Sequence, residues 1–468
     1  MSITIEQYPG QLILANSDML WEVTSNSSSN AQYQFIANLQ DGCGTVLTSV
    51  KQQPNPYSKG VFNLGRITKQ YLGFDTAQFN MGADSLFYKN TNTAKFFKVA
   101  FGEQYGTSVS SSVIVYNGIT NATSGSPAQT GSLPYYFLIN GTLDPNYGYW
   151  NWQTGSFYSP QTTPSSASFT KNVALTDADR TQSAHTTDYL TIGVLNGALN
   201  GSTSSAQDIY ALDINIYSGS TVVNSFTEYN ASSTTLASFG GPRTTPVQLW
   251  SAVAGVQTCT NNVGSQTSGS FLLNVGIGPQ NITNKGGYDL STQPWDYYTA
   301  TLRPQRSAGT VNLSASWDSF TILKQDYSCG YTGVRFAWVN DYGTWDWFNF
   351  TLQANIVTNV DRGLYYQTFV PYNTSTNDVA YNIQRRGSNA YYTNINQQFT
   401  ANSDWLTQEQ SDWLTKLFYS PSVYIQEGFN MIPIIITDNA FVTRTNPRTQ
   451  KNFQYAVNYT LANNKRSR

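Results

Sequence analysis

Short runs that alternate between apolar and polar residues recur along most of this chain, and they limit what it can fold into. Near the N-terminus, two runs place an apolar residue at every second position: Tyr33, Phe35, Ala37 and Leu39, and then Phe97, Val99 and Phe101. Successive side chains of a β-strand point to opposite faces, so a period of two indicates a strand with one buried face. The alternation predicts a mainly β protein.

The composition supports this prediction. The 468 residues include 32 Tyr, 24 Phe and 11 Trp, while charged residues make up only 11%. Aromatic side chains fit a pleated, half-buried surface, and a disordered chain would lack them. The length allows about two to four domains.

Further strand patterns follow in the middle and C-terminal parts of the chain, each bounded by Gly, Asn or Pro. The central ones are Leu190–Leu195, Ile209–Tyr217, Phe271–Ile277, Tyr297–Leu302, Phe320–Leu323 and Val334–Val339. The C-terminal ones are Val423–Gln426, Ile432–Ile436 and Phe453–Leu461. Short strands at this spacing are typical of antiparallel sandwiches or barrels. We therefore expect several β-sandwiches.

Two short helices interrupt the strand pattern. Thr407–Gln410 has the capping-box form, and an apolar stripe follows it up to Ser420-Pro421, which predicts a helix over residues 408–419. Leu64, Ile67 and Tyr71 have helical spacing after Asn63, a candidate N-cap, which predicts a second helix over residues 64–72.

Ser/Thr/Gly/Pro-rich stretches around residues 120–132 and 161–170 indicate loops or linkers. They divide the chain into four predicted segments: an N-terminal β-sandwich (1–118), an aromatic and Ser/Thr-rich insertion (119–180), a central β-sandwich (181–360) and a C-terminal β domain with one helix (361–468). Two of these segments are expected to carry sandwich cores of their own.

The charge pattern argues against nucleic-acid and membrane roles. The net charge is −2, and the one basic run, Lys465–Arg468, reads as a solvated tail, so no stripe exists to neutralise phosphates. No stretch approaches the length of a membrane span. The N-terminus lacks the pattern of a signal peptide, so we expect synthesis in a cytoplasm without general secretion.

Three cysteines lie far apart, with no Cys-x-x-Cys pattern and no nearby histidine: Cys43, Cys259 and Cys329. A disulfide framework or a zinc site is therefore not expected, and small buried side chains are the preferred interpretation. The sequence predicts neither a metal nor another cofactor.

The chain has a single histidine, His185, within the polar run Thr181–Thr187. Histidine is the usual general base near neutral pH, yet no nucleophile motif accompanies this one. We expect His185 in a surface loop, and a protein that is not an enzyme.

The densest acidic cluster lies in Asp341–Trp347. Asp341 and Asp346 would face opposite sides of a continuous strand, but a turn at Gly343 could bring them together as a carboxylate pair. The preferred interpretation is a tight hairpin in which an Asp caps the turn while Trp345 and Trp347 pack. These two tryptophans are also candidates for contact with a partner.

An aromatic segment between Pro134 and Trp152 is the other candidate contact surface. Its members that we single out are Tyr147, Tyr149, Trp150 and Trp152. Tyr and Trp offer a large contact area with a polar tip, which suits stacking on sugars or binding a partner protein. Packing in a core is the competing and stronger interpretation.

Four segments form a familiar combination: Ile13–Phe74, Gly276–Ile282, Cys329–Phe350 and the stretch from Asp404 to Asn464. Together they resemble virion structural proteins, of the tail or baseplate type, from tailed bacteriophages of aquatic or Bacteroidetes-like hosts. Such proteins tend to have an Asn-Arg-x-Gly turn where this chain has Asn340-Asp341-Tyr342-Gly343. The resemblance implies no catalytic residues.

The resemblance implies a tail, tail-tip or adaptor protein that assembles as a symmetric oligomer with other virion proteins. Three alternatives stay open: a host-attachment protein that binds surface glycans, a capsid decoration or head-fibre protein, and a polysaccharide-degrading tail protein that uses Asp341 and Asp346. The low content of charged residues suits a tail, tail-tip or adaptor protein, because it reduces the cost of burying large repeated interfaces during viral assembly.

Overall fold

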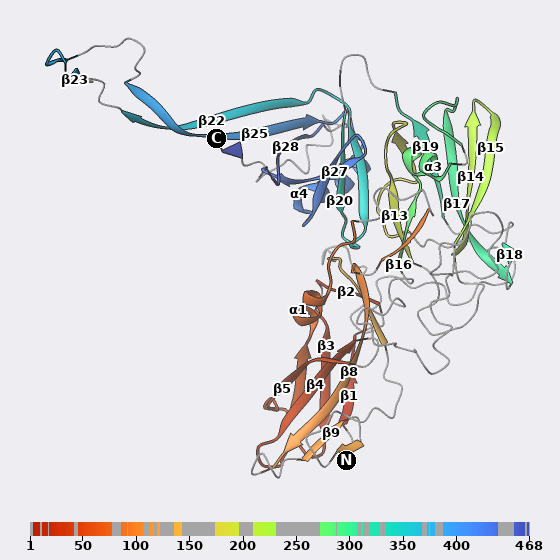
Figure 1. Cartoon of the computed structure of the whole chain (residues 1–468). Coiled ribbons are helices and arrows are strands. Elements are labelled where there is room, and N and C mark those ends of the chain that lie inside the picture. The colour runs from red at the N-terminus through yellow and green to blue at the C-terminus, as the bar shows by residue number, and fades with distance from the viewer. Residues whose placement is uncertain are drawn as a thin grey trace, which may run out of the picture. The chain divides into compact units, whose positions relative to one another are not determined.

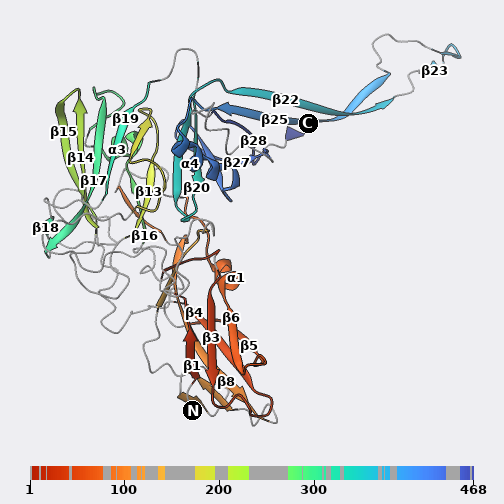
Figure 2. The same ribbon diagram turned by 180° about the vertical axis from the view of Figure 1, so that it is seen from behind.

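The computed structural model of the chain is drawn in Figure 1 and, from behind, in Figure 2. It describes residues 3–142, 174–195, 209–230, 272–438 and 454–467, with gaps at 10–11, 17, 42–44, 77–85, 91, 107–112, 117–118, 122–134, 287, 308–309, 312–317, 327–330, 332, 367–371, 374, 380–386 and 464–465. The chain forms two compact units, one of Met1–Gln325 with Val339–Trp347 and one of Asp326–Trp338 with Phe348–Arg468. Each unit consists mainly of antiparallel sheets, which confirms the predicted β class.

The N-terminal part of the first unit is a β-sandwich. One sheet has the order β1 (Ile3–Gln7), β3 (Leu20–Ser25) and β6 (Lys59–Asn63). The other contains β2 (Leu12–Leu14), β4 (Gln34–Asp41), β5 (Val46–Gln52), β8 (Ala94–Tyr105), β9 (Val113–Tyr116), β10 (Ile119–Asn121) and β11 (Tyr135–Ile139). All pairs are antiparallel except β2 with β11, which is parallel.

Aromatic side chains from both sheets fill the core of this sandwich. Phe101 of β8 lies 6.1 Å from Trp21 of β3 and 5.7 Å from Phe62 of β6, measured between ring centres. Phe35, Ala37, Leu39, Phe97 and Val99 belong to the same buried cluster. The alternation read from the sequence therefore identified the faces of β4 and β8 that line this core, while the opposite face of β4 is buried as well.

The rest of the first unit holds two further sheets. One contains β12 (Thr181–Ala184), β14 (Ile209–Ser218), β15 (Thr221–Tyr229), β17 (Tyr297–Ser307), β18 (Thr310–Val311) and β19 (Ser319–Lys324). The other contains β7 (Phe87–Lys89), β13 (Thr191–Leu195) and β16 (Leu272–Gly276). Because β7 pairs with β16, a strand from the predicted 1–118 segment joins a sheet of the predicted 181–360 segment.

The second unit contains most of an eight-stranded sheet, in which Val339 and Trp345–Trp347 at the strand ends belong to the first unit. The strands of this sheet are β20 (Val334–Val339), β21 (Trp345–Phe350), β22 (Asn355–Tyr366), β25 (Ser388–Asn402), β26 (Val423–Glu427), β27 (Asn430–Ile436), β28 (Ala456–Leu461) and β29 (Arg466–Ser467). A small pair, β23 (Tyr372–Asn373) and β24 (Asp378–Val379), is separate. The predicted segment boundary after residue 360 falls inside β22.

Three short α-helices occur among the described residues. The predicted helix over 408–419 is α4 (Gln408–Tyr419), and Trp413 on it packs 5.1 Å from Trp338, ring centre to ring centre. The predicted helix over 64–72 is α1 (Gly65–Thr68) followed by a 3-10 turn (Lys69–Tyr71). The third, α3 (Pro279–Lys285), was not predicted, although Pro279 at its start and Gly286 after its end are typical helix boundaries. None of these helices is long and apolar enough to span a membrane.

The capping box of α4 gives a direct test of local helix chemistry. Thr407 Oγ1 accepts a hydrogen bond from Gln410 N, and Gln410 Oε1 accepts one from Thr407 N, both at 3.2 Å. Thr407→Ala is expected to lower the free energy of unfolding by about 1 kcal/mol, measured by urea denaturation. Thr415→Ala, in the same helix, is the control, because Thr415 Oγ1 bonds only back to Asp412 O; an equal loss there would contradict the capping explanation.

Tyr459 makes the second unit sensitive to alkaline pH. Its ring lies 5.3 Å from the rings of both Phe336 and Phe399, and this burial, with the charge of Glu427, raises the pKa of Tyr459 from 10.0 to about 12. The unfolded phenol loses its proton first, so this group's stabilisation is complete below pH 10 and is lost as the pH rises to about 12.

The expected loss from Tyr459 across this window is about 2 kcal/mol. The measurement is the difference in the free energy of unfolding between wild type and Tyr459→Phe at several pH values. Phenylalanine keeps the packing but cannot ionise, so the difference should change with pH across the window. A difference independent of pH would rule out this titration.

Candidate interaction sites

The first residues of the aromatic segment predicted as a contact surface form β11, and residues 143–152 lie outside the described part of the chain. Tyr147, Tyr149, Trp150 and Trp152 all lie outside it. The three cysteines, Cys43, Cys259 and Cys329, do as well. These predictions therefore stay predictions, and the described candidates lie elsewhere.

The predicted hairpin at residues 340–347 is present and joins β20 to β21. Asn340 Oδ1 accepts hydrogen bonds from Tyr342 N at 3.0 Å and Thr344 N at 3.1 Å, and Gly343 has a φ of +77°. The residue that caps the turn is thus Asn340, and the expectation of an Asp cap is wrong. An amide oxygen accepts the same two hydrogen bonds as a carboxylate, and the strand register places Asn340 first in the turn.

Asp346 is buried beneath this turn. Its Oδ1 accepts hydrogen bonds from Thr176 Oγ1 at 2.6 Å and from Asn340 Nδ2 at 2.9 Å. Leu175 O accepts from Thr344 Oγ1 at 2.6 Å in the same cluster. A buried carboxylate with such donors joins the hairpin to residues 175–176, which is a structural use of the charge.

The two candidate tryptophans of the hairpin lie inside the fold. Trp345 and Trp347 are each 2% exposed. Trp345 Nε1 donates to Asp75 O at 2.9 Å, and Trp347 Nε1 donates to Thr191 O at 3.2 Å. Their packing follows the interpretation of the segment as a hairpin, and their rings are not at the surface of this chain.

His185 is buried, and the prediction of a surface loop is wrong. The polar run before it forms strand β12, which pairs in parallel with β19 and carries the histidine inward. His185 Nδ1 lies 2.6 Å from Gln325 O, and its backbone N donates to Asp188 Oδ2 at 2.8 Å. Parallel pairing with a strand far away in the chain leaves no local signal, which is why the sequence missed it.

The most exposed apolar surface of the second unit follows β22 and β25, which we call the arm (residues 355–366 and 388–402). These strands pair from Asn355–Thr400 to Tyr366–Ser388. In the described part of the chain, a further strand pairs with β25 only between Asn394 and Asn402: β28 pairs over Phe399–Asn402 and β29 pairs at Asn394 and Ile395. Figure 1 shows the two strands running on together beyond β28.

Apolar side chains are exposed on both faces of the arm. Even-numbered positions of β22 place Ile356, Val360, Leu364 and Tyr366 on one face, and odd-numbered positions place Val357 and Tyr365 on the other. Leu364 is 63% exposed and Tyr366 is 73% exposed. This surface was not predicted from the sequence, although the β-branched residues Ile356, Val357 and Val360 are typical of a strand.

Three tyrosines cluster where the arm contains a β-bulge. Tyr391 is the extra residue, since Gly363 pairs with Tyr392 and Leu364 pairs with Ala390. Its ring lies 4.9 Å from that of Tyr392 and 6.3 Å from that of Tyr365. A Cβ on Gly363 would lie 2.1 Å from Tyr392 Cε1, so glycine is needed for the rings to cover the backbone here.

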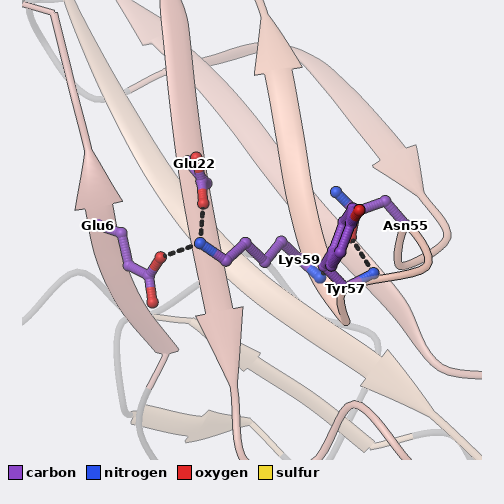
Figure 3. Close-up of polar contacts among 5 residues, drawn as sticks. All are labelled: Glu6, Glu22, Asn55, Tyr57 and Lys59. Atoms are coloured by element: carbon purple, nitrogen blue, oxygen red, sulfur yellow. Dashed lines mark hydrogen bonds and ion pairs between the residues drawn. The ribbon is translucent and has the colours of Figure 1, made fainter.

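A second exposed aromatic lies at the turn between β5 and β6 (Figure 3). Asn55 Oδ1 accepts hydrogen bonds from Tyr57 N at 2.9 Å and Lys59 N at 3.0 Å, which shapes the turn and leaves Tyr57 82% exposed. Beside it, Lys59 Nζ pairs with Glu22 and, at 2.6 Å, with Glu6. This joins strands β1, β3 and β6 by their side chains.

The contacts of Lys59 also shift the pKa values of Glu6 and of Lys59 itself. The hydrogen bond from Lys59 lowers the pKa of Glu6, and the hydrogen bonds to Glu22 and Glu6 raise the pKa of Lys59. Glu6 and Lys59 therefore keep their charges over a wider pH range than they would alone. The cluster of Lys59, Glu6 and Glu22 links side chains of three strands and lies beside one strongly exposed ring, that of Tyr57, so it is a weaker candidate for an interaction site than the arm.

Among the described residues, the arm is thus an extended exposed apolar surface, and the hairpin holds a buried polar cluster. Groups of three or more His, Cys, Asp or Glu side chains that could hold a metal ion do not occur among them. Comparison with protein-family models and with curated proteins finds no match for the chain. The candidate sites therefore rest on the geometry of the chain itself.

Proposed function

We propose that this chain is a structural component of a tailed-phage virion, as a tail, tail-tip or adaptor protein that assembles as a symmetric oligomer. The observation that carries the proposal is the arm, which exposes apolar side chains on both faces. The resemblance of four segments to phage virion proteins supports the same assignment. The protein would be made in the host cytoplasm and act in the particle.

The arm supports an assembly role for a physical reason. An isolated two-stranded ribbon is marginally stable in water, and an exposed apolar edge invites association. Soluble monomers keep large contiguous apolar patches rare, so a patch that follows two long strands marks an interaction site. An assembly subunit stabilises such a ribbon when neighbouring subunits cover it.

The test is the composition and structure of purified particles. Mass spectrometry with a quantified peptide standard should find the chain in many copies per particle, and cryo-electron microscopy should show it in a symmetric ring. Density on the capsid surface would instead support the decoration or head-fibre alternative. Absence of the chain from washed particles would contradict the virion assignment.

A second candidate function, recognition of host glycans, is favoured by one observation. Tyr365, Tyr391 and Tyr392 form an exposed ring cluster at the bulge of the arm, and such rings stack on sugars. Binding of the purified protein to host cells or to a glycan array, compared with Tyr391→Ala, tests this. Equal binding by both proteins would remove the cluster from consideration.

A further inference from the structure

The arm is longer than its own unit can cover. β22 has 12 residues and β25 has 15, whereas strands of about 5 or 6 residues are typical. From Ser388 to Thr393, the described pairs of β25 are with β22 alone. Twelve residues rise about 40 Å along a strand, and two paired strands are about 10 Å wide, so each face of the arm measures about 400 Å².

This area decides between two ways of covering the arm. A stable interface buries about 800 Å² on each partner. Two arms stacked face to face would bury only about 400 Å² each and would leave apolar residues such as Val357 or Leu364 in water. Coverage of both faces reaches about 800 Å², so a partner has to enclose the arm.

The charge of the arm favours a second copy of this chain as that partner. Its strands carry one acidic residue, Asp361, and one basic residue, Arg362, and neither Lys nor Pro interrupts them. Charged ligands such as nucleic acid or an anionic lipid surface find no complementary field here. The chain as a whole has a net charge of −2, so the electrostatic repulsion between copies that bind each other's arms is small.

We propose that the arm of each copy inserts into a second copy of the chain, which covers both its faces. This inference rests on the proposed assembly function and names the segment that assembles. Contact of one arm with a different surface on the next copy is heterologous, and such contacts form a ring when the rotation between copies closes and a helical filament when it does not. Leu364 and Tyr366, near the far end of the arm, are central to this contact.

The test is self-association of the purified chain, measured by sedimentation equilibrium and light scattering over a dilution series. The wild type is expected to form oligomers, and Leu364→Thr with Tyr366→Thr should weaken the association constant by about 100-fold, because each lost anchor costs roughly tenfold. Threonine keeps a high strand propensity. A wild type that stays monomeric at the highest concentration would overturn the proposal.

A matched control distinguishes the effect of apolar side chains on the arm from the effect of exposed apolar side chains elsewhere on the protein. Ile435→Thr with Val222→Thr replaces apolar side chains that are 58% and 50% exposed and lie outside the arm, and association should equal that of the wild type. Equal weakening in both double variants would overturn the proposal. So would wild-type association of the arm variant.

Two further measurements show whether the arm variant folds and whether the arm itself is covered on association. Far-ultraviolet circular dichroism and hydrogen exchange of core amides should be the same in the arm variant and in dilute wild type, which shows that the variant folds. Exchange of the β22 amides should slow with wild-type concentration, and unchanged exchange would count against the arm. The particle analysis is independent of these results, because a chain absent from particles can still associate through its arm.

Discussion

Replacing Gly343 by alanine is expected to lower the free energy of unfolding by about 2–5 kcal/mol. Gly343 has a φ of +77°, where an L-residue costs roughly 1–2 kcal/mol. The new Cβ would also lie 2.4 Å from Asn140 O, which belongs to the backbone. Because Asn140 N is hydrogen-bonded to Thr93 O at 2.8 Å, this segment cannot move away freely.

The measurement is urea denaturation of the variant beside Gly219→Ala. Gly219 has a φ of +59°, and a Cβ added to it would have no other atom within 4 Å, so it isolates the backbone contribution. We expect the control to lose only about 1–2 kcal/mol. Equal losses at the two glycines would mean that the close approach between the hairpin turn and residue 140 does not contribute.

Replacing Asp346 by leucine is expected to lower the free energy of unfolding by about 4 kcal/mol, because hydrogen bonds to a charged group contribute about 1.5–3 kcal/mol each. The change removes the acceptor of Thr176 Oγ1 and one acceptor of Asn340 Nδ2. Leucine has no acceptor atom, so the hydrogen bonds that both donors make to this buried position would be lost. Urea denaturation of the purified variant measures the loss.

Asp346→Asn is the conservative comparison. Its amide keeps one acceptor oxygen at nearly the same place, so the expected loss is about 1–2 kcal/mol. If neither leucine nor asparagine at position 346 changed the free energy of unfolding, the carboxylate would have no structural role. A depolymerase assay would then be needed to test Asp346 and Asp341 as a catalytic carboxylate pair.

Local chemistry made α4 predictable from sequence. Thr407 and Gln410 satisfy each other's backbone groups within four residues, so the start of the helix depends on nothing distant. The apolar faces of β4 and β8 were predictable for a similar reason, since a period of two shows which apolar side chains share a face; that the opposite face of β4, with Asn38 and Gln40, is buried as well was not visible in it. Short α3 escaped prediction because its seven residues carry no repeated apolar stripe.

The hairpin site was partly predictable. Gly343 marked the turn, and Trp345 and Trp347 were expected to pack. Adjacent Asn340 and Asp341 are equally suited to cap a turn, so the choice between them required the register of β20 against β21. The link from Asp346 to Thr176 spans 170 positions and leaves no trace in either local segment.

The sequence by itself determined the β class, which apolar side chains share a strand face and the chemistry of a helix start, because these depend on neighbours a few residues apart. Tertiary structure decided which apolar faces are covered. Ile356, Val357 and Val360 are residues of the types that fill core strands, yet their side chains are exposed, while the polar run at Thr181–His185 leads into the interior. Burial depends on which distant segments pack against a face, and alternation along one strand carries no information about them.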